Sequence, residues 1–224
     1  MSTLCNVEAR GDGAVSPSVG LASSSIPEAG NAQKGVSLRY AYNPDKHWWV
    51  LRATYGREKL AYEYISHDGL DSEAFYARHW VRKTIRGKLV RILDTLIPGI
   101  LFVYCTESQI NAYVKETPRL SFLRFYYNHC AGDENAMDPP LQIRYEDMMN
   151  FISLISVDDD HIIRVDREYV HYQSGDEVIV TEGKFTGVKG KVARAAGQQR
   201  VIVELEGVAL IATAYVRSEW IEKL

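Results

Sequence analysis

The stretch from residue 175 to 197, GDEVIVTEGKFTGVKGKVARAAG, constrains the fold more than any other part of the chain. Its valines alternate with other residues at the period of a half-buried β-strand, and glycines interrupt the pattern at short intervals. Glycine adopts positive φ without a steric cost, so we expect Gly183, Gly187 and Gly190 to support a tight hairpin. The stretch therefore predicts a small all-β module.

The same stretch contains Gly190 followed by Lys191, the pair that ends a phosphate-binding loop in nucleotide-hydrolysing enzymes. Such a loop needs Ser or Thr at the next position, because that hydroxyl holds magnesium, and it must continue into a helix. Here Val192 follows, and the pattern continues as a strand. We therefore do not expect a phosphate loop in this stretch.

Composition limits the classes of protein that this sequence can represent. The 224 residues, 46% hydrophobic and 25% charged, suffice for one large or two small domains. The formal net charge of −3 argues against a protein that coats nucleic acid, so any such contact should be local. Cys5, Cys105 and Cys130 are too widely spaced for a disulfide framework. We expect a cytoplasmic protein with no secretory signal and no membrane contact.

The chain divides into four expected parts. Residues 1–46, rich in Ser, Ala, Gly and Pro, are expected to form a disordered leader. Residues 47–156 should form an α+β domain in which helices cover a mainly antiparallel sheet. Residues 157–173 read as a linker that opens with an acidic run, and residues 174–224 read as a small all-β barrel.

The hydrophobic pattern within residues 47–156 predicts the order β-α-β-β-β-α-β-α. We expect strands within 47–55, 75–85, 88–93, 97–105 and 120–128, and helices within 57–70, 107–117 and 144–156. The first strand should be buried on both faces, because Trp48 and Val50 alternate with Trp49 and Leu51. Two of the strands flank a turn at Arg86 and Gly87, and with the next strand they suggest an antiparallel meander.

The glycine-rich stretch resembles the KOW motif, G-D-x-V-x-V-x-x-G-x-F-x-G-x-x-G-x-V. The matching residues are Gly175, Asp176, Val178, Val180, Gly183, Phe185, Gly187, Gly190 and Val192. KOW modules are small SH3-like barrels that also occur in ribosomal proteins. This resemblance therefore implies the fold of the module more than its function.

Two segments of the N-terminal part resemble a family. HWWVLRATYGREKLAYEYI is similar to the opening of NusG N-terminal (NGN) domains, and IPGILFVYC is similar to a strand of the same domains. With the KOW motif behind them, the chain resembles a NusG-type transcription elongation factor from about residue 47 to its end. The amino-acid sequences of these segments are most similar to those of the UpxY-like antiterminators of surface (capsular) polysaccharide operons. The resemblance implies a protein without catalytic activity or cofactor that binds RNA polymerase and suppresses pausing or termination.

The resemblance also implies a polymerase-binding face. Trp49, Tyr55, Ile97, Pro98, Ile100 and Phe102 are the candidates for contact with the clamp helices of the β′ subunit, and Asn111 and Tyr113 for contact with the gate loop of the β subunit. Buried aromatic anchors dominate the binding energy of most interfaces. Ile97 and Ile100 depart from the family, which often has Phe and Tyr there. The alternative for each residue is a place in the ordinary core.

Residues 78–91 carry basic residues and no acidic one: Arg78, Arg82, Lys83, Arg86, Lys88 and Arg91. On a hairpin such side chains can project toward a phosphate backbone, so we expect contact with non-template DNA or nascent RNA. Arg57 and Lys59 extend this candidate interface, and the resemblance adds Arg119. The alternative is a hairpin that contacts solvent alone.

Catalytic and metal sites are not predicted. His129 and Cys130 are adjacent and cannot readily reach one ion together. The acidic run Asp158 to Asp160 lacks the glycine and distal Glu of a calcium loop, and we interpret it as a solvated linker.

A function of a different class stays open, namely a KOW-bearing RNA-binding or ribosome-associated protein. Lys184, Lys189 and Lys191 would contact the RNA, although residues 174–224 hold as many acidic as basic residues. The sequence leaves the partner of the C-terminal module open between a ribosomal protein, a termination factor and no partner.

Overall fold

The computed structural model describes residues 40–127, 139–195 and 197–224, with the backbone alone for residues 173–176. Most of the expected leader and the His129–Cys130 pair lie outside the described residues. Tyr40 is buried and packs edge-on against Trp48, with ring centroids 5.2 Å apart. The folded domain therefore includes residues that the sequence assigned to the leader.

The main sheet has the strand order β2-β5-β1-β6, and β7 also pairs with β1. Its strands are β1 (His47–Ala53), β2 (Glu73–Phe75), β5 (Ile100–Cys105), β6 (Leu123–Phe125) and β7 (Gln142–Ile143), and every pairing is antiparallel. The expected burial of β1 on both faces is confirmed. Trp48 and Val50 point into one hydrophobic cluster, and Trp49 and Leu51 point into another.

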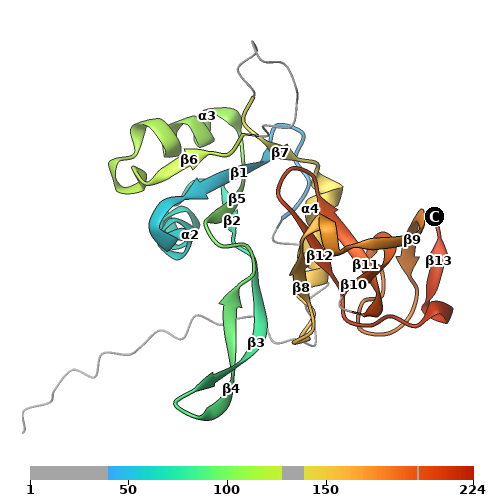
Figure 1. Ribbon diagram of the computed structural model, residues 1–224. Helices are drawn as coiled ribbons and strands as arrows, with labels where there is room; N and C mark the ends of the chain where they lie inside the picture. Colours follow the sequence, from blue (N-terminus) through green and yellow to red (C-terminus); the bar gives the residue numbers. More distant parts are fainter. Residues whose placement is uncertain (1–39, 128–138, 196) are drawn as a thin grey trace, which may run out of the picture.

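Helices cover both faces of the main sheet (Figure 1). α2 (Glu58–His67) and α3 (Glu107–Asn111), which continues into a π-helical turn (Ala112–Glu116), lie on the Trp49 face, and α4 (Tyr145–Ile155) lies on the Trp48 face. α3 begins with a capping box at Thr106. Leu60 of α2 is 57% exposed. None of the helices in the described ranges is long and apolar enough to cross a membrane.

β3 (Arg78–Ile85) and β4 (Lys88–Thr95) form a separate two-stranded sheet. The expected turn is confirmed, because Arg86 and Gly87 both have positive φ, 49° and 76°, as a tight hairpin turn requires. The expected meander is wrong, because β5 pairs with β1 and β2 and not with β4. In Figure 1 the hairpin projects away from the main sheet.

The C-terminal part forms a six-stranded antiparallel sheet with the order β13-β9-β10-β11-β12-β8. Its strands are β8 (Ile163–Val165), β9 (His171–Val180), β10 (Lys189–Ala195), β11 (Gln198–Leu205), β12 (Ala209–Ala212) and β13 (Ile221–Lys223). No pairing between β13 and β8 closes this sheet within the described residues, so the expected SH3-like barrel is not confirmed. β8 comes from the expected linker, which therefore contributes a strand.

α4 connects the two sheets. Figure 1 shows it between the main sheet and the C-terminal sheet. Phe151 belongs to a hydrophobic cluster that contains Phe102 of β5 and also Val201 of β11. The side-chain amide of Asn150 donates to the carbonyl oxygen of Lys189 and accepts from its N–H, both at 2.8 Å. The apolar face of the main sheet under α4 is thus covered within the chain. Short 3₁₀ turns at Thr54–Gly56, Pro118–Leu120, Arg167–Tyr169 and Ser218–Trp220 complete the described elements.

Candidate protein and nucleic-acid interfaces

The apolar candidates are divided between the two faces of the main sheet. Ile97, Ile100 and Phe102 lie beneath α4, with 2%, 8% and 0% of their surface exposed, whereas Trp49 lies on the opposite face against α2 and α3. The ring of Phe102 packs on that of Phe151 of α4, with centroids 5.9 Å apart. These four residues occupy core positions in this structure and do not form one exposed surface.

The other two apolar candidates are exposed at one end of the main sheet. Tyr55 is 89% exposed, and Pro98 is exposed in the turn before β5. The N–H of Ala53 donates to the carbonyl oxygen of Gly99 at 2.8 Å, which places this turn beside the end of β1. Glu58, buried at the start of α2, accepts a hydrogen bond from the N–H of Gly99. Sequence reasoning missed this role of Glu58.

Arg57 adds a charge to the same end of the sheet. Its guanidinium group lies 5.6 Å from the ring centroid of Tyr55 and 5.4 Å from that of Phe122. Tyr55 has a φ of 62°, a conformation that costs a residue with a Cβ about 1–2 kcal/mol. We call Tyr55, Arg57, Pro98 and Phe122 the sheet-end patch. Lys59 lies nearby in sequence and pairs at the surface with Glu63, at 3.6 Å.

The candidates after β5 do not form a cluster with this patch. Tyr113 is buried, and its hydroxyl donates a hydrogen bond to the carboxylate of Asp68. Burial, together with this hydrogen bond, raises the pKa of Tyr113. The half-buried Asn111 donates to the carbonyl oxygen of Glu107 at 2.9 Å, within its own helix. Arg119 is exposed in a 3₁₀ turn. Tyr113 therefore has a structural role here, and Arg119 is a surface residue.

The basic residues of the hairpin lie on both of its faces. Arg82 is directly opposite Arg91, and Lys83 is directly opposite Val90. Successive residues of a strand point to opposite faces. One face therefore carries Arg78, Arg82 and Arg91, the other carries Lys83 and Lys88, and Arg86 lies in the turn. The six cations do not project together as one cluster.

The acidic run contacts the arginine face of the hairpin. One carboxylate oxygen of Asp160 accepts from Nε of Arg82 at 2.7 Å, and the other accepts from Nε of Arg91 at 2.5 Å. Asp158 accepts a second hydrogen bond from Arg91. The hydrogen bond from Arg91 lowers the pKa of Asp160, whose side chain is 11% exposed. The interpretation of this run as a solvated linker is wrong, because two of its three carboxylates are held by arginines.

The remaining hairpin cations differ in how they are compensated. Lys83 pairs with Asp94 at 2.5 Å, and its hydrogen bond lowers the pKa of Asp94. The guanidinium of Arg78 lies 4.8 Å from the ring centroid of Tyr76. Arg86 and Lys88 are exposed at the tip and have no ion-pair partner in the part of the chain that the structure describes. Cations without an ion-pair partner among the described residues thus lie at the tip, at Arg86 and Lys88, and at the base of the hairpin, at Arg78.

The glycine-rich stretch forms the turn between β9 and β10. Gly183 and Gly187 have φ of 82° and 88°, as expected. Gly190 does not have the expected positive φ; it is required because a Cβ there would lie 2.3 Å from the carbonyl oxygen of Ile202. Phe185 is buried in the core. The motif residues Gly175 and Asp176 lie in β9, and the side chain of the latter lies outside the description.

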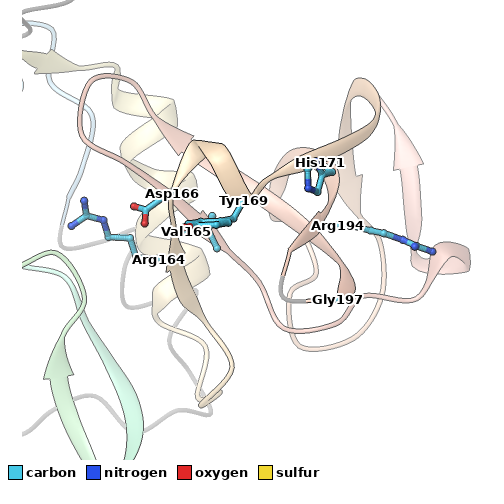
Figure 2. A pocket seen from close by; sticks show the side chains of 7 residues that line it. All are labelled: Arg164, Val165, Asp166, Tyr169, His171, Arg194 and Gly197. Carbon is cyan, nitrogen blue, oxygen red and sulfur yellow. The ribbon is translucent and has the colours of Figure 1, made fainter.

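A hollow of about 560 Å³ lies between β8, the turn Arg167–Tyr169 and β10. Figure 2 shows that the side chains of Arg164 and Arg194 point away from Tyr169 in opposite directions. Small-molecule sites usually bring a few polar groups together in an apolar hollow, and that convergence is missing here. Nor do any three His, Cys, Asp or Glu side chains within the described ranges come together to hold a metal.

Comparison with known proteins gives a family match in the N-terminal part. Residues 46–151 match the family described as "NusG: Transcription termination factor nusG". Among solved structures, a chain of "Crystal Structure of MjSpt4:Spt5 complex conformation B" aligns at 15% sequence identity over 79% of this chain and 96% of that chain, with a TM-score of 0.25. A similarity of that size supports no inference. The comparison with curated proteins gives no match.

Proposed function

We propose that this chain, in which residues 46–151 form a NusG family domain, is a transcription elongation factor that binds RNA polymerase. The family match carries the proposal. The matched residues include the sheet-end patch, the basic hairpin and most of α4, so both candidate interfaces belong to the NusG family domain.

The sheet-end patch supports a contact with the polymerase. Aromatic and arginine side chains contribute most to binding energy at protein interfaces, and Tyr55 and Arg57 are both exposed. The hydrogen bonds of Gly99 with Ala53 and Glu58 fix the backbone around them, so little order has to be gained on binding. We assign the first contact with the clamp to this patch. The face that holds Phe102 becomes available to a partner only when α4 moves.

The hairpin supports a second contact, with nucleic acid close to the polymerase. Arg86 and Lys88 extend from the far end of β3 and β4 and have free charge to offer to phosphates. Because the whole chain is slightly acidic, this contact is local. Non-template DNA and nascent RNA share the phosphate chemistry that such a tip recognises.

In its finer form, the proposal assigns the protein to the suppression of pausing or termination in a surface-polysaccharide operon. The similarity of LRATYGREKLAYEYI and VTEGKFTGVKGKV to the UpxY-like members supports this assignment. A factor that binds the closed clamp better than the open clamp shifts the polymerase toward the closed state. A polymerase that stays in the closed state pauses and terminates less often, so it makes longer transcripts.

Run-through transcription of a terminator-bearing template tests the function. Adding the full chain to purified core polymerase should raise the fraction of transcripts that pass the terminator. Tyr55→Ala should lose most of that gain, while Tyr169→Ala, which also removes an exposed ring but lies outside the matched domain, should keep it. An unchanged run-through fraction with the parent protein would overturn the antitermination assignment.

A further inference from the structure

The centre of the hairpin is built as an anion site. Arg82 and Arg91 are directly opposite each other across β3 and β4. Like charges in this position destabilise a sheet, because their side chains are held close together. An anion between them removes the repulsion. The sequence therefore places at the hairpin centre two guanidinium groups that need a shared counter-ion.

Asp160 supplies that counter-ion with one oxygen for each arginine, at 2.7 Å and 2.5 Å. Asp158 adds a second carboxylate on Arg91. Guanidinium N–H groups donate charge-assisted hydrogen bonds to phosphate oxygens as they do to carboxylate oxygens. Two carboxylates spaced along one chain segment thus contact the arginines in the way that successive phosphates would.

The segment that carries these carboxylates is held in place from the other side. The buried Arg200 of β11 donates to the carbonyl oxygen of His161 at 2.8 Å and to that of Thr213 at 2.6 Å. Asp159 lies 3.5 Å from Nζ of Lys184, in the turn between β9 and β10. The acidic run is therefore positioned by the C-terminal sheet.

We propose that Asp158 and Asp160 form an internal latch that takes the place of nucleic-acid phosphates at Arg82 and Arg91, and that a phosphodiester backbone displaces this latch to bind the centre of the hairpin. The inference rests on the proposed contact between the hairpin and nucleic acid. In the latched state, the two arginines at the centre of the hairpin are paired, whereas Arg86 and Lys88 at the tip have no ion-pair partner among the described residues. Once the latch opens, the phosphates replace the carboxylates.

Two features favour displacement by nucleic acid. Ion pairs with partly exposed partners are weak in water, and Arg82 and Arg91 are 63% and 38% exposed. Trp80 lies beneath Arg91, with 4.5 Å between its ring centroid and the guanidinium carbon, so the ring helps to hold this cation at the site when the carboxylates leave.

The test measures binding of the full chain to a labelled single-stranded DNA of mixed sequence by fluorescence anisotropy at low salt. Asp158→Asn combined with Asp160→Asn should tighten binding by about tenfold, because two cations become available to phosphates. The matched control combines Asp147→Asn and Glu204→Gln, which removes two carboxylates that pair with other arginines, Arg144 and Arg167. It should change affinity by less than about twofold.

A second variant protein shows whether the gain in affinity arises at Arg82 and Arg91. In a protein that carries Arg82→Gln and Arg91→Gln, the same latch substitutions should give no gain. Asp158→Asn alone removes one of the two carboxylates that pair with Arg91, so the gain in affinity should be smaller. This single variant keeps the test available if the double variant does not fold.

The outcomes separate the latch from the hairpin contact itself. Arg86→Gln with Lys88→Gln, at the tip, reports on that contact. If the tip variant weakens binding and the latch variant does not tighten it, the latch is overturned and the hairpin contact stands. If the tip variant binds as the parent does, the proposed hairpin contact fails, and the latch fails with it.

Discussion

Phe102 of β5 packs on Phe151 of α4 with ring centroids 5.9 Å apart, and this contact fixes α4 on the main sheet. Both side chains are fully buried. Phe102→Ala should therefore leave a cavity and lower the free energy of unfolding by about 3–5 kcal/mol. Denaturant unfolding measures this change. A loss below about 1 kcal/mol would show that the ring is not packed in the core in solution.

Glu58 should stabilise the folded domain by holding the turn before β5. Glu58→Ala removes the acceptor of the Gly99 N–H and should cost about 1–3 kcal/mol of unfolding free energy, because that donor loses its partner. Glu63→Ala, in the same helix and exposed, is the control and should stay within about 0.5 kcal/mol of the parent. Equal losses of unfolding free energy in the two variants would show that the hydrogen bond between Glu58 and Gly99 does not stabilise the domain.

Gly187, in the turn between β9 and β10, and Gly190, within β10, should respond differently to a methyl group. Gly187 has open space around its Cα but a φ of 88°, so Gly187→Ala should cost about 1–2 kcal/mol. Gly190→Ala brings a Cβ into the backbone of Ile202 and should cost about 3 kcal/mol, since the backbone must shift. Thermal unfolding of the two variants compares them directly. The reverse order would contradict the close approach of β10 and β11.

The latch should depend on pH through Asp160. Its pKa is lowered by the hydrogen bond from Arg91, next to Arg82 and Asp158. A carboxylate with a lowered pKa stabilises the folded state at pH above the ordinary value near 3.9, and that contribution is lost as the pH falls through the lowered value. NMR titration of the Asp160 carboxyl carbon should give a midpoint below about 3.9, and Arg91→Gln should raise it. A midpoint at the ordinary value, unaffected by Arg91→Gln, would mean that the ion pair does not form in solution.

The sequence predicts elements whose residues show a period or a local signal. The alternation of Trp48 to Leu51 predicts a strand buried on both faces, and the Arg86-Gly87 turn is a local signal of two residues. β2 and β7 have three and two residues, too few to show a period. Their assignment depends on their pairing with β5 and β1.

The candidate site was predictable only in part, because its contacts are not local. Asp160 and Arg82 are 78 positions apart in sequence, and nothing in the acidic run shows that arginines will hold it. The position of Phe102 has a related cause. An apolar strand residue has the same sequence pattern whether its ring packs under a helix of the same chain or anchors a partner, so the burial beneath α4 emerged from the structure alone.

Binding of the full chain to purified core RNA polymerase tests the central claim most directly. We expect a Kd of about 1 μM or below, equivalent to about −8 kcal/mol, and a loss of about tenfold or more with Tyr55→Ala but not with the control Tyr169→Ala. Absence of binding at concentrations of about 50 μM, with the parent protein folded, would contradict the assignment of this chain to transcription elongation.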